Sequence, residues 1–176
     1  MGAKRKVCML GATGVGKTSL VARFVRSIFS EAYRTTIGVT IEARRVRCDG
    51  EELDLILWDL SGEDEFQSVQ VSYLRGSSGF LLVIDGTRRA TVETALRLHD
   101  AAQAAAGAVP AVFVLNKADL MATWEIDEAA EAALRRAGLL VARTSAKTGA
   151  GVEEAFSALA RAILASEAPS RRGGST

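Results

Sequence analysis

Residues 11–18 read Gly11-Ala12-Thr13-Gly14-Val15-Gly16-Lys17-Thr18, and this G-x-x-x-x-G-K-T pattern restricts the chain to few folds. The residues immediately before it, 6–10, form a short apolar run that is typical of a buried strand. The residues after it, 19–26, place their apolar side chains on one face of a helix. Because the pattern lies between a strand and a helix, it predicts a loop that binds phosphate groups.

Each residue type in this loop suits that chemistry. Glycines let the backbone curl so that successive N–H groups point inward at phosphate oxygens. The N-terminus of the following helix adds partial positive charge. Lys17 supplies a full positive charge, and the hydroxyl of Thr18 suits a Mg²⁺ ion that bridges two phosphates. The loop therefore predicts a nucleotide site.

Length and charge exclude several other classes. The chain has 176 residues and a formal net charge of +1, which suits one domain without a basic surface for nucleic acid or anionic membrane. Cys8 and Cys48 form no metal-binding or redox pattern. The apolar run behind residues 1–6 is too short for a signal peptide, and residues 171–176 hold no cysteine for prenylation. We expect a cytoplasmic monomer with no direct lipid anchor and no nucleic-acid partner.

A hairpin leads toward the expected metal site. Residues 39–48 and 53–58 read as strands, and Asp49-Gly50 between them is typical of a tight antiparallel turn. The second strand runs into a D-x-x-G sequence, residues 59–62. A carboxylate at the end of a strand near the phosphate loop, Asp59, suits the Mg²⁺ side of the site. The backbone N–H of the glycine that ends the sequence suits a contact with the terminal phosphate.

A second motif predicts which base is bound. The apolar strand 110–115 runs into Asn116-Lys117-Ala118-Asp119, an N-K-x-D sequence. The edge of guanine offers N1–H and the N2 amine as paired donors, which a carboxylate accepts with both oxygens, so Asp119 suits guanine. The stem of Lys117 is long enough to lie along a base, and Asn116 suits a link between loops. The small residues 144–147 suit the guanine carbonyl, because they offer backbone N–H groups.

Apolar runs and amphipathic segments alternate along the chain. Further strands are predicted at 80–85 and 139–143, and helices at 65–75, 91–106, 125–137 and from 152 onward. Thr91 is expected to be the N-cap of the helix at 91–106. This alternation predicts a three-layer α/β domain over residues 1–165, with a six-stranded, mostly parallel sheet, one antiparallel strand and about five helices. Residues 166–176 are expected to be a disordered tail. Right-handed crossovers would gather the motifs at one edge of the sheet.

The ordered motifs resemble those of the Ras superfamily of small GTPases: G-A-T-G-V-G-K-T, T-I-G, W-D-L-S-G-E, N-K-A-D and T-S-A-K. The resemblance covers residues 4 to about 165. Residues 36–39 are similar to the Rab branch, while the Arg- and Ala-rich composition favours a prokaryotic member. The resemblance implies a P-loop NTPase G domain that binds GTP or GDP with Mg²⁺.

The resemblance also implies residue roles. Catalysis would involve Lys17, Thr36 and Glu63, and the Mg²⁺ ligands would be Thr18, Thr36 and, through water, Asp59. An aromatic residue, Phe29, would lie against the base. The residues implied to bind nucleotide are Gly11, Thr13, Gly14, Val15, Gly16, Lys17, Thr18, Ser19, Phe29, Thr36, Gly62, Asn116, Lys117, Asp119, Ser145, Ala146 and Lys147.

Two residues depart from the family pattern. Glu63 replaces the Gln that orients the attacking water in most members. At ~4 Å, the repulsion between a glutamate and the γ-phosphate is of order 1 to 4 kcal/mol in a partly hydrated site, so slow hydrolysis is expected. Thr13 replaces a glycine of Ras itself, which affects access for an arginine finger more than nucleotide binding.

Three functions follow from these motifs. The first is a GTP/GDP switch with weak GTPase activity, whose exchange factor, activating protein and effectors contact residues 31–42 and 60–75. The second is a constitutively GTP-loaded binding module in which Glu63 impairs hydrolysis. The third is a P-loop kinase or ATPase, against which the N-K-A-D motif and the lack of an Arg-rich lid both argue.

Overall fold

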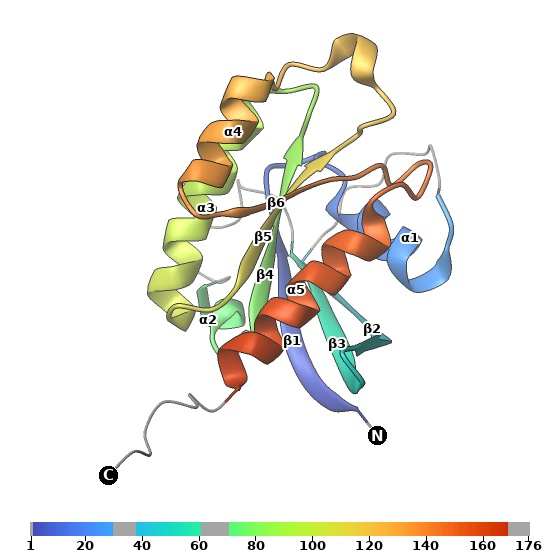
Figure 1. Ribbon diagram of the computed structural model, residues 1–176, viewed down its shortest axis with the longest axis vertical. Helices are drawn as coiled ribbons and strands as arrows, with labels where there is room; N and C mark the ends of the chain where they lie inside the picture. The colour runs from blue at the N-terminus through green and yellow to red at the C-terminus, as the bar shows by residue number, and fades with distance from the viewer. Residues whose placement is uncertain (1, 30–37, 61–70, 169–176) are drawn as a thin grey trace.

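The computed structural model describes residues 2–29, 38–60 and 71–168. One central sheet carries helices on both faces (Figure 1). The strands are β1 (Ala3–Leu10), β2 (Val39–Cys48), β3 (Glu51–Leu60), β4 (Gly79–Asp85), β5 (Ala111–Asn116) and β6 (Leu140–Arg143). The helices are α1 (Lys17–Arg26), α2 (Val71–Leu74), α3 (Ala90–Ala106), α4 (Glu128–Arg136), α5 (Val152–Glu167) and the short 3₁₀ turn η2 (Met121–Thr123).

The sheet has the predicted α/β architecture. Its strand order is β2-β3-β1-β4-β5-β6, and only the β2–β3 pair is antiparallel. Asp49 and Gly50 make the turn of that hairpin with φ values of 53° and 83°, a conformation that Gly and Asp tolerate better than most residues. The prediction of a mostly parallel six-stranded sheet with one antiparallel strand is therefore confirmed.

Successive residues of the inner strands enter two different cores. In β1, Val7 and Met9 face the core that contains α1 and α5, whereas Cys8 and Leu10 face the core that contains α3 and Leu134 of α4. Side chains alternate across a strand, so a strand covered by helices on both faces is apolar throughout. All seven residues of β4 are buried for this reason.

Several element boundaries differ from the predicted ones. Thr91 was expected to cap a helix, but α3 begins at Ala90, and the buried Thr91 hydroxyl instead donates to the carbonyl of Arg88 at 2.7 Å. The helix predicted from residue 125 begins later, because the Asp127 side chain caps α4 by accepting from the N–H of Ala130. The last helix, α5, continues to residue 167, two residues beyond the predicted end of the domain.

The stacked pair Phe24 and Phe156 joins α1 to α5, with ring centroids 3.8 Å apart. We expect Phe156→Ala to lower the free energy of unfolding by about 3–5 kcal/mol, because it leaves a cavity and removes the stacking partner. Urea unfolding measures this change. Leu140→Ala is the matched control, since the Leu140 side chain is 46% exposed and should cost far less. Equal losses in the two variants would contradict this account of the core.

Candidate functional site

Loops that follow four parallel strands meet at one edge of the sheet. β1 leads into the phosphate loop, β3 carries Asp59 near its end, β5 ends at Asn116, and β6 leads into residues 144–147. Parallel strands present their carboxyl ends at the same edge. Hydrogen bonds between these loops, described below, bring together predicted residues from motifs more than 100 positions apart. The predicted convergence is therefore present in the described part of the chain.

Two glycines of the phosphate loop have no room for a side chain. A Cβ on Gly11 would collide with the carbonyl oxygen of Val83, and one on Gly16 would collide with the amide of Asn116. Both glycines also have positive φ, 151° and 104°, which side chains disfavour. The loop thus lies directly against β4 and the N-K-x-D segment.

Lys17 is the buried cation of the loop. It is 7% exposed, and its Nζ donates to the carbonyls of Gly11 at 2.9 Å and Ala12 at 3.0 Å. Burial lowers the pKa of its ammonium to about 8, with the charge of Asp59 opposing the shift and that of Arg88 adding to it. A buried ammonium of this kind gains an anionic partner when a phosphate enters the loop.

Thr18 and Asp59 provide the oxygen atoms expected at a Mg²⁺ site. The Thr18 hydroxyl donates to Asp59 Oδ2 at 2.6 Å, and Asp59 is 1% exposed. Hydroxyl and carboxylate oxygens at the edge of a phosphate loop are ligands that Mg²⁺ prefers, usually together with water and phosphate oxygens. The donor set therefore fits Mg²⁺. The third predicted ligand, Thr36, lies outside the described residues.

Asn116 ties three loops together. Its Nδ2 donates to the carbonyl of Val15 in the phosphate loop at 3.0 Å. Its Oδ1 accepts from the Thr144 hydroxyl at 3.0 Å and from the N–H of Ala146 at 3.3 Å. Since Asn116 is 2% exposed, these bonds satisfy an otherwise costly buried amide. The predicted linking role of this residue is visible in its contacts.

The residues expected to read the base lie next to Asn116. Ser145 is buried, and its hydroxyl donates to Asp119 Oδ1 at 2.7 Å, which fixes the carboxylate on the rim of the site. Lys117 Nζ donates to the carbonyl of Gly14 at 3.0 Å, and the residue has a φ of 70°. The arrangement suits a flat ligand between the Lys117 stem and the 144–147 loop.

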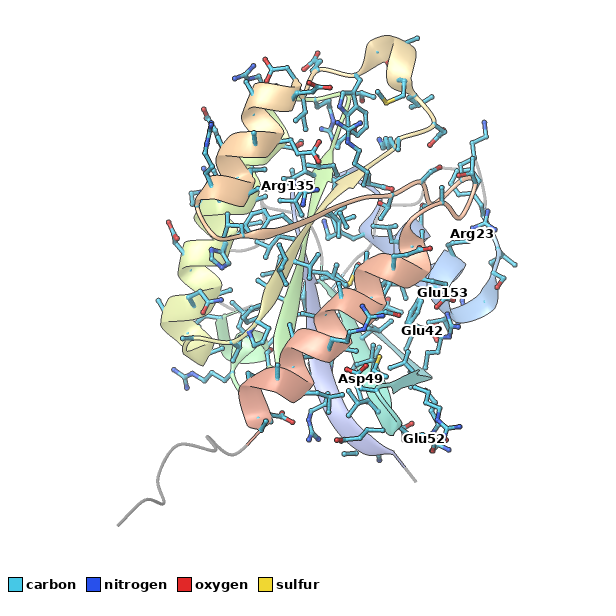
Figure 2. The ribbon with its side chains drawn as sticks, in the orientation of Figure 1. Arg23, Glu42, Asp49, Glu52, Arg135 and Glu153 are labelled. Atoms are coloured by element: carbon cyan, nitrogen blue, oxygen red, sulfur yellow. The ribbon has the colours of Figure 1, made fainter. Side chains whose placement is uncertain are left out.

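Arg23 is a supporting residue that the motifs did not indicate. Arg23 projects from α1 (Figure 2). Its Nε donates to the carbonyl of Ala146 at 2.8 Å, and its Nη2 donates to the carbonyl of Lys147. The helix that starts at the phosphate loop thereby holds the base-side loop. Arg23 lies more than 120 positions before Ala146 and Lys147 in the sequence, and no sequence pattern predicts contacts at that separation.

Asp85 and Arg88 are two further supporting residues that the sequence motifs did not indicate. Asp85, the last residue of β4, is 1% exposed and accepts from Lys117 Nζ at 2.8 Å and Arg88 Nε at 2.9 Å. Arg88 Nη2 donates to the carbonyl of Thr13 at 2.9 Å. The sequence offers one sign of a role for Asp85: like Asp59, it is an acidic residue at the carboxyl end of an apolar strand. Arg88 has no comparable sign.

The remaining predicted site residues are either outside the described part of the chain or beside the contacts given above. Thr36, Gly62 and Glu63 lie outside the described residues. Ser19 lies in the first turn of α1 and is half-buried. Phe29 is partly buried and packs against the core on the α1 and α5 side.

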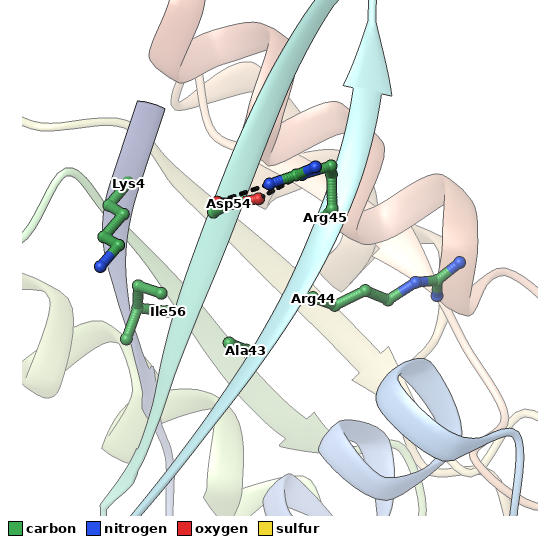
Figure 3. Close-up of a pocket in the computed structure, with 6 residues that line it drawn as sticks. All are labelled: Lys4, Ala43, Arg44, Arg45, Asp54 and Ile56. Carbon is green, nitrogen blue, oxygen red and sulfur yellow. Dashed lines mark hydrogen bonds and ion pairs between the residues drawn. The ribbon is translucent and has the colours of Figure 1, made fainter. Parts of the chain in front are cut away.

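A separate hollow of about 400 Å³ lies on the outer part of the sheet (Figure 3). It is lined by Lys4, Ala43, Arg44, Arg45, Asp54 and Ile56. Lys4 is near the start of β1, whereas the phosphate loop follows the end of that strand. Arg45 Nε donates to Asp54 Oδ1 at 2.7 Å, so the charges of these two side chains offset each other. The hollow is not part of the nucleotide site.

Comparison with known proteins agrees with this geometry. The sequence model of the Ras family matches residues 6–165. The chain is also similar to Ras-related protein Rab-13 of Canis lupus familiaris, with 34% identity over 172 residues, which cover 97% of this chain and 85% of that protein. Both matches include the phosphate loop and the N-K-x-D segment. The chain therefore belongs to the Ras family of small GTPases.

Proposed function

We propose that this protein is a Mg²⁺-dependent GTP/GDP switch that hydrolyses GTP slowly. The observation that carries the proposal is the joining of the phosphate loop to the N-K-x-D segment through Asn116, with Asp119 and Ser145 beside it. A phosphate site next to a carboxylate suited to guanine supports a guanine nucleotide as the ligand. Ras-family GTPases in general bind guanine nucleotides and Mg²⁺, which supports the same reading.

The residues divide into two groups around the proposed nucleotide. Lys17 turns its ammonium from the loop carbonyls to the terminal phosphates, and the loop N–H groups donate to phosphate oxygens. Thr18 and, through water, Asp59 would hold Mg²⁺, which would neutralise negative charge on the phosphates. Asp119 accepts from the guanine edge, while the N–H groups of the 144–147 loop face its carbonyl. Thr36 and Gly62 would respond to the γ-phosphate, so its loss would release both segments.

Partners are proposed to contact residues 31–42 and 60–75. Within the described part of these segments, Ile41 is 53% exposed and pairs across the hairpin with Trp58. The Trp58 ring lies 5.7 Å from that of Tyr73, and Lys6 Nζ lies over Trp58 at 3.9 Å. An exposed apolar side chain, Ile41, beside the half-buried rings of Trp58 and Tyr73 suits contact with an exchange factor, an activating protein or an effector.

The proposal places the protein in the cytoplasm, with any membrane association supplied by a partner. Across residues 2–29, 38–60 and 71–168, no helix has both the length and the apolar character needed to cross a membrane.

The alternative is a constitutively GTP-loaded binding module. Substitution of Glu63 distinguishes the switch from the loaded module, because the negative charge of Glu63 would repel the γ-phosphate and the attacking hydroxide that forms there. We expect the wild-type protein to hydrolyse bound GTP slowly but completely in a single turnover, and Glu63→Gln to raise the rate by about tenfold. Phosphate release after Mg²⁺ addition to the preloaded protein measures both rates.

Glu154→Gln is the matched control, since it makes the same change on the exposed face of α5. No hydrolysis in the wild type together with a rise of about 10³-fold in Glu63→Gln would favour the loaded module. A lower rate in Glu63→Gln would mean that Glu63 assists the attacking water, which contradicts the repulsion argument.

A further inference from the structure

Arg88 and Lys117 each bond both to the buried carboxylate of Asp85 and to a backbone carbonyl of the phosphate loop. Arg88 Nη2 donates to the carbonyl of Thr13 at 2.9 Å, and Lys117 Nζ donates to the next carbonyl, that of Gly14, at 3.0 Å. Both cations also donate to the same oxygen, Asp85 Oδ2, at 2.9 and 2.8 Å. A single carboxylate therefore sets the position of both donors on adjacent peptide groups.

Asp85 and Arg88 are held in a closed turn. The N–H of Arg88 donates to the carbonyl of Asp85 at 2.9 Å, and the N–H of Asp85 donates to the hydroxyl of Thr91 at 3.0 Å. Thr87 donates to Asp85 Oδ1 through its N–H at 2.9 Å and its hydroxyl at 2.6 Å. Burial alone would raise the pKa of Asp85, but bonds from Lys117, Thr87 and Arg88 outweigh it and keep that pKa below its usual value.

The direction of these bonds determines where the loop N–H groups point. In a trans peptide the N–H of one residue lies opposite the carbonyl of the residue before it. A donor that holds the Thr13 carbonyl outward thus turns the N–H of Gly14 the other way, toward the concave side of the loop. Gly14 has a φ of 76°. Because glycine has no side chain to restrict its backbone, a donor outside the loop can determine the orientation of the Thr13–Gly14 peptide.

We propose that Arg88 is a positioning residue for the nucleotide phosphates: anchored by Asp85, it orients the Thr13–Gly14 peptide so that the Gly14 N–H donates to a phosphate oxygen. The proposal rests on the proposed nucleotide function. Arg88 suits this role better than Lys, because its planar fork donates from Nε to one oxygen and from Nη2 to another. Its charge also lies close enough to Lys17 to add to the positive field of the loop.

The test compares Arg88→Gln with Arg89→Gln and Arg88→Lys. Arg89→Gln removes the same charge at the next residue, whose side chain is exposed. We expect Arg88→Gln to weaken GDP binding by about tenfold, the effect of one charged hydrogen bond, and Arg88→Lys to recover only part of this loss. Arg89→Gln should change it by less than about twofold. Competition against a fluorescent GDP analogue gives the affinities.

A second readout separates positioning from general destabilisation. In ¹H–¹⁵N spectra of the GDP complexes, Arg88→Gln should shift the Gly14 amide to lower proton frequency, since its hydrogen bond to phosphate weakens. The Ala146 amide, which donates to Asn116 on the base side, should stay in place. Unchanged GDP affinity in Arg88→Gln, or equal shifts of both amides, would overturn the proposal. Failure of the wild type to bind GDP would instead refute the proposed function.

Discussion

Asp119→Asn is expected to lower the affinity for GDP by about 10²- to 10⁴-fold and to make xanthosine diphosphate the better ligand. A carboxylate accepts from both N1–H and the N2 amine of guanine, whereas an amide presents one acceptor and one donor. Xanthine carries a carbonyl in place of the amine, so it matches the amide. The hydroxyl of Ser145, 2.7 Å from Asp119 Oδ1, keeps the side chain at position 119 in place for this reading.

Competition binding with GDP, ADP and xanthosine diphosphate tests this predicted change of base preference. Asp127→Asn is the matched control, because Asp127 is an exposed aspartate that caps α4 and lies in none of the site motifs. It should leave all three affinities unchanged. If Asp119→Asn keeps the wild-type preference for GDP over ADP, the guanine assignment fails.

Lys17→Met should have opposite effects on binding and on stability. We expect GDP affinity to fall by about 10²- to 10³-fold, because the variant loses a buried charged partner of the terminal phosphates. The nucleotide-free protein should become more stable by about 1–2 kcal/mol, since the buried ammonium is costly until a phosphate enters. Its pKa of about 8 is the sign of that cost. Calorimetric titration with GDP and urea unfolding measure the two quantities.

The stability effect has its own pH signature. Above about pH 8 the folded, nucleotide-free protein has lost the Lys17 proton, whereas the unfolded chain keeps it up to about 10.5. The unfolded state then binds more protons, so stability should rise with pH across this window in the wild type, and less so in Lys17→Met. A lower stability of Lys17→Met without nucleotide, or the same pH slope in both proteins, would contradict the account.

The sheet and the meeting of the motifs were predictable from the sequence for a physical reason. Apolar strands that alternate with amphipathic helices have few ways to pack, and parallel strands place the residues after them at one edge. Asn116 illustrates this, because the sequence indicates a link between loops, and its amide bonds to the phosphate loop and to Thr144 in the structure. Motif spacing and topology together were sufficient for this part of the site.

The supporting contacts were not predictable in the same way. Arg23, Asp85 and Arg88 belong to no motif, and their partners are chosen by tertiary packing at long range. Helix starts were also misjudged: Thr91 has a capping side chain, but its hydroxyl bonds to the turn at residues 85–88 because that turn lies directly before α3. Local preference alone does not determine which of two available partners a hydroxyl selects.

The most direct test of the central claim is the identity of the nucleotide released when freshly purified protein is denatured. Chromatography of the released material should show guanine nucleotide at about one molecule per chain, mostly GDP, because slow hydrolysis still runs to completion during purification. Mostly GTP would keep the guanine site but favour the loaded module. Adenine nucleotide bound at one molecule per chain would contradict the guanine assignment, and with it the function proposed for this chain.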